Sequence, residues 1–189
     1  MGFKVIGVMS PGNMGSAIAK ILGQNGYDVI TCLKGRSDFT RNKAADAGMR
    51  DVASLEDLVT EADLVLSILD PGKAVAISEE ISQAMKNTGN TPVYADCNAT
   101  SPQTATELQG IIEGAGAVFV DVGIIGAAPS PGNFPDFCTS GPDAALLDEL
   151  AGKGVGILNI GPEIGQGSAI KICNGAWNKG AFALYTAVM

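Results

Sequence analysis

Residues 5–19 decide the fold, and their sequence is Val5-Ile6-Gly7-Val8-Met9-Ser10-Pro11-Gly12-Asn13-Met14-Gly15-Ser16-Ala17-Ile18-Ala19. The apolar, β-branched beginning predicts a buried strand, and the small residues after the turn predict a helix. We expect four side chains of that helix to face inward: Ala17, Ile18, Ile21 and Leu22. The stretch therefore predicts the first strand, turn and helix of a dinucleotide-binding unit.

The turn has the spacing of the G-x-G-x-x-G fingerprint, with one change. Ser10 holds the place of the first glycine, while Gly12 and Gly15 hold the other two. Glycine lets the backbone approach a pyrophosphate, and the helix N-terminus offers free N–H groups and a positive dipole end. We expect the phosphates at the turn that begins with Ser10 and Pro11. The alternative is an ordinary turn that only packs tightly.

The loop after the second predicted strand, residues 27–33, decides cofactor preference. An acidic residue at the end of that strand would bind the ribose 2′-hydroxyl of NAD, but Asp28 lies at its beginning. Basic and hydroxyl side chains follow the strand instead: Lys34, Arg36, Ser37 and, one helical turn on, Arg41. Such groups suit a 2′-phosphate, so we expect NADP rather than NAD. The alternative is a solvated basic loop.

Composition supports an α/β domain and excludes several partners. The chain has 189 residues, of which 46% are hydrophobic and 17% charged, and this suits a domain with a largely buried sheet. A net charge of −8 argues against nucleic acid or an anionic membrane as the main partner. Histidine is absent, so acid–base chemistry needs another group, such as lysine.

The cysteines and the hydropathy pattern indicate a cytoplasmic protein. The four cysteines are widely spaced, and we expect reduced and mostly buried thiols: Cys32, Cys97, Cys138 and Cys173. We find no targeting sequence and no apolar run of the ~18 residues that a membrane span needs, and we expect no metal site.

Strands and helices alternate through the rest of the chain, which predicts a doubly wound, mostly parallel sheet with ligand at the carboxyl ends of the strands. The strand over residues 62–69 ends at Leu69 and Asp70, where a bound cofactor would pass. Asp70 also suits the cap of the next helix. Residues 123–135 are expected as a long loop, either a lid over substrate or a connection.

The last element is a helix from residue 165 to the chain end. Helical spacing places Lys171, Asn174, Gly175 and Asn178 on one face. A lysine in a low-dielectric site can relay a proton, and asparagine can orient a hydroxyl or carbonyl group. The alternative is a half-exposed lysine whose ammonium reaches solvent. Residues 1–164 are thus a predicted NADP-binding domain, and residues 165–189 begin an interdomain helix.

Four segments together resemble the β-hydroxyacid dehydrogenase superfamily, to which 3-hydroxyisobutyrate and 6-phosphogluconate dehydrogenases belong. They are the turn Gly12-Asn13-Met14-Gly15, the strand end Cys97-Asn98-Ala99-Thr100-Ser101-Pro102, the loop from Asp121, and Gly165-Gln166-Gly167 leading to Lys171. Within the superfamily the chain looks most like a branch of poorly characterised 6-phosphogluconate dehydrogenase-like proteins.

The resemblance implies hydride transfer between NADP and a hydroxyl carbon of a small, hydroxyacid-like substrate. Lys171 would then be the general acid/base, and Asn98 would lie beside the nicotinamide ribose. The pyrophosphate side would be contacted by Gly12, Asn13 and Met14.

Three departures from the family pattern bear on the substrate. The family's Ser-Gly-Gly loop aligns with Ile125-Gly126-Ala127, so its serine is absent. The family's asparagine partner of the lysine falls on Gly175, which leaves Asn174 as catalytic partner and Asn178 beside the substrate. The family's helical C-terminal domain, which makes a homodimer, is absent or truncated here.

Two other functions stay open at the level of sequence. The stretch from Pro11 to Ile18 also resembles pyrroline-carboxylate and imine reductases, although Lys171 argues against them. A non-catalytic NADP-binding module is the other alternative, favoured by the missing serine and the missing helical domain.

Overall fold

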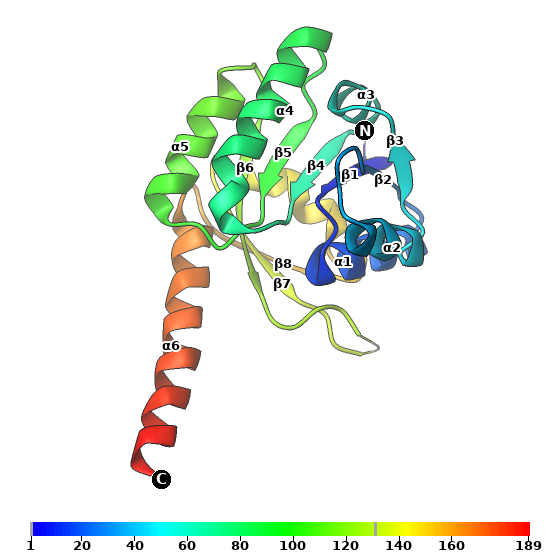
Figure 1. Ribbon diagram of the computed structural model, residues 1–189. Helices are drawn as coiled ribbons and strands as arrows, with labels where there is room; N and C mark the ends of the chain where they lie inside the picture. The colour runs from blue at the N-terminus through cyan, green and yellow to red at the C-terminus, as the bar shows by residue number, and fades with distance from the viewer. Residues whose placement is uncertain (1, 131) are drawn as a thin grey trace.

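The computed structural model describes residues 2–130 and 132–189 and is an eight-stranded sheet covered by helices (Figure 1). The strands are β1 (Val5–Met9), β2 (Asp28–Cys32), β3 (Arg50–Val52), β4 (Leu64–Ser67), β5 (Val93–Asp96), β6 (Phe119–Ile125), β7 (Asp136–Ser140) and β8 (Gly156–Gly161). The α-helices are α1 (Asn13–Gln24), α2 (Asp38–Asp46), α3 (Leu55–Glu61), α4 (Ala74–Thr88), α5 (Pro102–Glu113) and α6 (Gln166–Val188). The 3₁₀ helices are η1 (Pro71–Lys73) and η2 (Ala144–Leu150).

The sheet has the order β3-β2-β1-β4-β5-β6-β7-β8. All neighbours pair in parallel except β6 and β7, which are antiparallel. The direction of winding reverses between β1 and β4, and this is where doubly wound sheets form a crevice outside the strand ends. The predicted fold class is confirmed.

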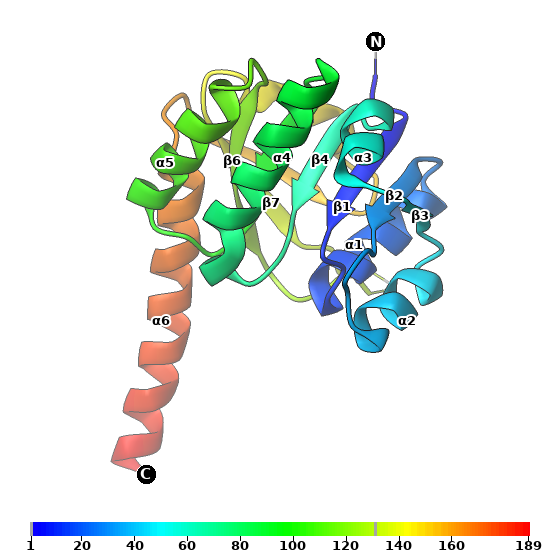
Figure 2. The ribbon, with the colours of Figure 1, turned by 45° about the horizontal axis from the view of Figure 1, so that its top comes forward.

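The central strands β1 and β4 are buried on both faces, which explains their continuous apolar runs. One core cluster joins α1 and η2 to the sheet, with Ile18, Leu22 and Leu147 fully buried. The other joins α3, α4 and α5 to the opposite face, where Figure 2 shows these helices in front of the strands.

Helix α6 runs away from the sheet, and its far end carries the C-terminus (Figures 1 and 2). Only Gly167 and Ser168, in its first turn, are buried. Trp177 and Phe182 are more than 70% exposed, at 78% and 75%. Within the described residues, no helix has the length and apolar character that crossing a membrane requires. Cys173 on α6 is exposed, whereas the other three cysteines are buried.

Two expectations about local structure were wrong. The loop expected over residues 123–135 begins later, because β6 continues to Ile125 as an antiparallel partner of β7. The ladder with β7 outweighs the poor strand propensity of Gly123. In addition, Ala17 and Ile21 are only partly buried, because the connection between β6 and β7 leaves a groove over that side of α1.

Candidate functional site

The turn after β1 adopts the conformation that the fingerprint requires, although a serine stands at the first position. Ser10 has φ +52°, the one positive φ of a non-glycine residue in the described chain. Left-handed backbone costs an L-residue roughly 1–2 kcal/mol, so the surrounding structure holds this turn against local strain. Pro11, at the next position, is buried.

The N-terminus of α1 lacks the serine cap that three of the other α-helices have. Serine side chains cap α2, α3 and α5 through Ser37, Ser54 and Ser101, whereas no side chain caps α1. Its N-cap residue is Gly12, and a Cβ there would meet no atom within 4 Å. The first-turn N–H groups of α1 are thus available to an anion beside open space.

A cleft of about 330 Å³ lies at this helix end, between the turn and the end of β4. Most of the predicted cofactor residues line it: Ser10, Gly12, Asn13, Met14, Arg36, Leu69 and Asp70. Thr40 and Lys73 line it as well and were not predicted. Lys73 directly follows the Asp70-Pro71-Gly72 turn. Its place just after the predicted strand end could have indicated that it lines the cleft.

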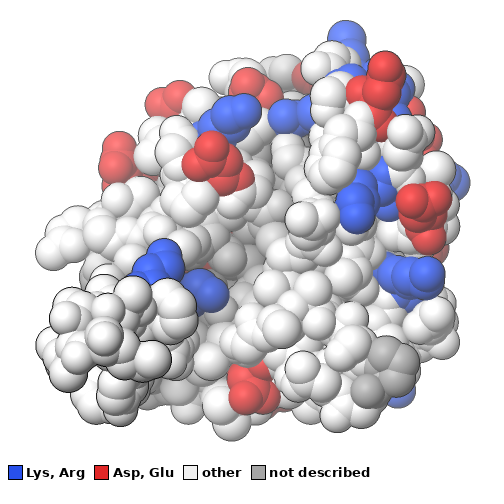
Figure 3. Space-filling view, turned by 60° about the horizontal axis from the view of Figure 1, so that its bottom comes forward, with Lys and Arg blue, Asp and Glu red and all other residues white. Residues whose placement is uncertain are grey.

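Arg36 connects this cleft to two neighbouring cavities of about 380 and 320 Å³, and Lys34 lines both of those. The acidic Glu80 also lines both neighbours. Figure 3 shows the face that holds the strand ends, with Lys and Arg side chains around a hollow. The structure therefore brings the fingerprint turn and Arg36 of the basic loop to the same cleft, with Lys34 in the two cavities beside it.

Ser37 and Arg41, two of the side chains expected near a 2′-phosphate, make hydrogen bonds within the protein. The Ser37 hydroxyl accepts a hydrogen bond from the Thr40 backbone N–H at 3.4 Å and caps α2. The Arg41 guanidinium donates to the carbonyl oxygens of Leu33 and Arg36 at 2.7 and 3.2 Å. Arg41 therefore shapes the loop, while Arg36 presents its side chain to the cleft.

Asp70 and Asn98 both accept hydrogen bonds from backbone N–H groups at the carboxyl end of the sheet. The Asp70 carboxylate accepts from the Gly72 N–H at 3.0 Å, which is the capping role considered for it. The buried Asn98 amide accepts from the Leu69 N–H at 2.7 Å and donates to Ser67 and Asp96 at 2.9 and 2.6 Å. Asn98 thus fixes the backbone of Leu69, which lines the cleft.

Asp96 is a buried acid that the sequence analysis missed. One of its oxygens accepts from Asn98, and the other has no hydrogen-bond partner among the described residues. Burial, with a smaller contribution from the neighbouring Asp121 carboxylate, raises its pKa to about 6 against the opposing hydrogen bonds from Asn98. Its place at the end of the apolar strand β5 gave no sign of this environment.

Lys171 lies in the second turn of α6, half-buried against β6. Its ammonium donates a hydrogen bond to the carbonyl oxygen of Ile124. Burial lowers its pKa, the Lys179 charge lowers it further, and Cys138 opposes the change. Ile124 immediately precedes Ile125 and Gly126, so the predicted proton carrier and predicted substrate residues lie together. Gly126 has φ +112°, a conformation that favours glycine.

Asn174 and Asn178 make no hydrogen bond to Lys171 among the described residues. Both are exposed on α6, and the Asn178 amide donates to the Asn174 side-chain oxygen at 3.1 Å. Lys171 also does not line the cleft at α1, where the predicted cofactor residues gather.

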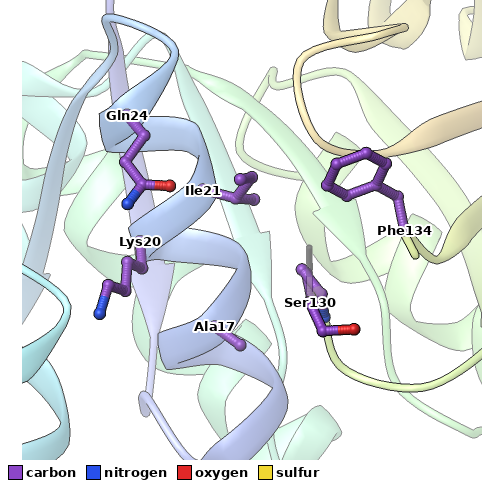
Figure 4. A pocket seen from close by; sticks show the side chains of 7 residues that line it. Ala17, Lys20, Ile21, Gln24, Ser130 and Phe134 are labelled. Atoms are coloured by element: carbon purple, nitrogen blue, oxygen red, sulfur yellow. The ribbon is translucent and has the colours of Figure 1, made fainter. Parts of the chain in front are cut away.

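A second groove, of about 440 Å³, separates α1 from the connection between β6 and β7. Figure 4 shows Ile21 of α1 and Phe134 of the connection on opposite sides of it. Phe134 is 48% exposed, and Lys20 and Gln24 add polar groups to the groove. Sequence patterning gave no signal for it, because its two walls are more than a hundred residues apart.

Comparison with known proteins identifies relatives of this arrangement. A family model described as the NAD binding domain of 6-phosphogluconate dehydrogenase matches residues 5–148. An uncharacterised 28.5 kDa protein of Methanothermus fervidus is 30% identical over 179 residues, which cover 95% of this chain and 67% of that protein. Mitochondrial 3-hydroxyisobutyrate dehydrogenase of Bos taurus is also 30% identical, over 89% of this chain and 51% of the enzyme.

Solved structures show the same architecture. A conserved protein of unknown function, with structural similarity to 3-hydroxyacid dehydrogenases, has a TM-score of 0.82 at 29% identity, covering 95% of this chain and 66% of that one. An imine reductase from Myxococcus stipitatus has a TM-score of 0.79 at 20% identity, covering 100% of this chain and 65% of that one, and shows a shared fold. The chain spans about half the length of the 3-hydroxyisobutyrate dehydrogenases that it matches.

Proposed function

The chain belongs to the family of the NAD-binding domain of 6-phosphogluconate dehydrogenase, and on this premise we propose that it is part of an NADP-dependent oxidoreductase. The proposed reaction transfers hydride between the nicotinamide and a hydroxyl or carbonyl carbon of a small, hydroxyacid-like molecule. Residues 1–164 would form the cofactor domain, and residues 165–189 would carry the proton-relaying lysine to it.

The observation that carries this proposal is the uncapped N-terminus of α1 beside the open space at Gly12. A pyrophosphate needs N–H donors, a positive helix end and room for close backbone approach, and this position offers all three. The residues present therefore fit a dinucleotide. Gly12, Asn13 and Met14 would hold the pyrophosphate, and Leu69 and Asp70 would flank the path toward the nicotinamide.

The basic side chains that line this cleft and the two cavities beside it support NADP over NAD. Arg36 lines the cleft and both neighbouring cavities, and its guanidinium is suited to a 2′-phosphate. Lys34 and Lys73 add positive charge nearby. The end of β2 offers no carboxylate at Cys32 or Leu33 for a free 2′-hydroxyl.

Hydride chemistry belongs to the nicotinamide when it is bound, and this chain's residues supply position and a proton route. Lys171 would exchange a proton with the substrate oxygen. Its lowered pKa increases the fraction of neutral amine, which can accept the proton during oxidation. The Ile124 carbonyl oxygen orients the Lys171 ammonium next to Ile125 and Gly126, the residues we propose beside the substrate.

The similarity to 3-hydroxyisobutyrate dehydrogenase suggests a hydroxyacid. Ile125 offers no hydroxyl to a substrate carboxylate, so we expect a more apolar substrate end beside it. Asn174 and Asn178 would contact such a substrate only if it extends along the exposed side of α6.

The test is an oxidation assay of a hydroxyacid panel with NADP⁺, using wild type, Lys171→Met and the surface control Lys153→Met. We expect turnover by wild type and by the control, with a loss of about 10²–10⁴-fold in kcat for Lys171→Met while NADPH still binds. Reduction of cyclic imines without hydroxyacid oxidation would contradict the proposal in favour of an imine reductase. NADPH binding without turnover of either class would favour a non-catalytic module.

A further inference from the structure

The carboxylate of Asp121 lies at the centre of a buried hydrogen-bond cluster where α6 meets the sheet. One oxygen accepts from the Ser140 hydroxyl at 2.9 Å, the Gly165 N–H at 3.0 Å and the Ser168 N–H at 2.9 Å. The other accepts from the Ser168 hydroxyl at 2.6 Å. Asp121 and Ser140 are fully buried register partners on β6 and β7.

The cluster holds the beginning of α6 in one place. The Ser140 hydroxyl also accepts from the Gly167 N–H at 3.0 Å, so β6 and β7 together bind N–H groups of three residues around the first turn. Helix α6 has no other side-chain cap at its N-cap residue, Gly165. Asp121 therefore fills, from a distant strand, the role that a local serine fills in α2, α3 and α5.

We propose that Asp121 is a positioning residue for Lys171, fixing the first turn of α6 so that the lysine side chain meets the Ile124 carbonyl oxygen. This inference rests on the proposed function, in which Lys171 carries the proton. Lys171 lies one turn after Gly167 and Ser168, and Asp121 lies three residues before Ile124 on the strand that accepts the lysine. One carboxylate thus fixes the spacing between the helix and its strand.

Close packing makes that spacing sensitive to small movements. A Cβ on Gly167 would collide with the Cys138 carbonyl oxygen, and a Cβ on Gly123 would come within 3.1 Å of the Lys171 Cβ. The helix therefore lies directly on the strand backbone at this point. If the first turn loosens, Lys171 loses both its carbonyl partner and its partial burial.

An amide replaces this carboxylate only in part. Four hydrogen-bond donors converge on the two Asp121 oxygens. An asparagine has one accepting oxygen and no negative charge, and its NH₂ group would face the Ser168 hydroxyl, which would have to turn and accept. Asp121→Asn keeps the volume of the side chain but replaces charge-assisted hydrogen bonds with weaker neutral ones, which loosens the helix start.

The test measures the pKa of Lys171 by NMR, with lysine labelled at the side-chain nitrogen and the signal assigned by Lys171→Arg. In Asp121→Asn we expect the Lys171 pKa to rise toward the ordinary lysine value, because the amine becomes more solvated. We expect amide exchange at Ser168 to accelerate about 10- to 100-fold. Removing a negative charge without movement would instead lower the lysine pKa, so the direction separates the two causes.

Two further variants complete the experiment. Ser168→Ala removes one of the four hydrogen bonds to Asp121 and should raise the Lys171 pKa by a smaller amount. This variant tests the positioning role if Asp121→Asn does not fold. Asp63→Asn is the matched control, because Asp63 accepts from the Lys4 and Val5 N–H groups at 2.7 and 2.9 Å, away from α6. It should leave the Lys171 pKa unchanged.

An unchanged or lowered Lys171 pKa in folded Asp121→Asn and Ser168→Ala would overturn the positioning role. Titration of the same samples with NADPH tests the proposed function separately, because the lysine measurement needs neither cofactor nor substrate.

Discussion

The backbones of Gly123 in β6 and Gly167 in α6 are in close contact, so that a Cβ on Gly123 would collide with the Gly167 carbonyl oxygen. Neither residue has a positive φ, so conformational freedom does not explain them. Close approach does, because the helix that carries Lys171 packs directly on the strand that accepts its hydrogen bond.

We predict that Gly123→Ala lowers the free energy of unfolding by about 1–3 kcal/mol through overpacking. Gly175→Ala is the matched control on α6, since a Cβ there meets nothing within 4 Å. That variant should be neutral or stabilising by up to about 1 kcal/mol. Urea unfolding measures both, and equal effects of the two substitutions would contradict the close packing.

Gly12→Val should abolish or greatly weaken NADPH binding while leaving stability within about 1 kcal/mol of wild type. The backbone at Gly12 is extended, with φ −85°, and tolerates a side chain, which would point into the open space at the α1 N-terminus. Gly23→Ala, near the other end of α1 and equally unobstructed, should bind NADPH normally. Calorimetric titration checks this, and full affinity in Gly12→Val would place the pyrophosphate elsewhere.

Arg36→Ala should weaken NADPH binding by about 1–3 kcal/mol, the range for loss of a charge-assisted hydrogen bond, and barely change NADH binding. Arg41→Ala is the informative comparison. Its guanidinium holds the loop through the Leu33 and Arg36 carbonyl oxygens, so its loss should disturb the loop as a whole. Fluorescence titration with each cofactor separates the effects. Equal losses for both cofactors in Arg36→Ala would refute the assignment of Arg36 to a 2′-phosphate.

Stability should depend on pH through Asp96. Its pKa rises from 3.8 to about 6 on folding, so the folded state favours the protonated acid. The unfolded state loses its proton first as pH rises, and the contribution of Asp96 therefore falls between pH 4 and 6. Asp96→Asn should gain roughly 2–3 kcal/mol relative to wild type between pH 4 and 7.

Urea unfolding across that pH range measures the difference, with exposed Asp143→Asn controlling for the loss of one negative charge. A difference between wild type and Asp96→Asn that stays constant with pH would show that Asp96 is ionised without penalty in the fold.

Local chemistry made much of this fold predictable. Asp70 caps the helix that follows it, as its position before Pro71 predicts. The order of strands and helices follows from apolar runs separated by turns. The α1 turn was recognisable although Ser10 replaces a glycine, because the surrounding strand and helix supply the context.

Contacts between distant segments account for what was missed. The prediction that Asn98 lies beside a ribose stays a prediction, and the sequence did not indicate that its amide also binds Ser67 and the Leu69 N–H, about 30 residues away in the chain. Helical spacing gave the shared face of Asn174 and Asn178, yet it could not indicate that this part of α6 extends beyond the sheet. The capping of α6 by Asp121 joins residues 47 apart in the chain.

Calorimetric titration of the wild-type chain with NADPH, alongside NADH, tests the central claim most directly. The account predicts saturable binding of one NADPH per chain, tighter than NADH, at the bare N-terminus of α1. The absence of binding by either dinucleotide to the folded chain would contradict it.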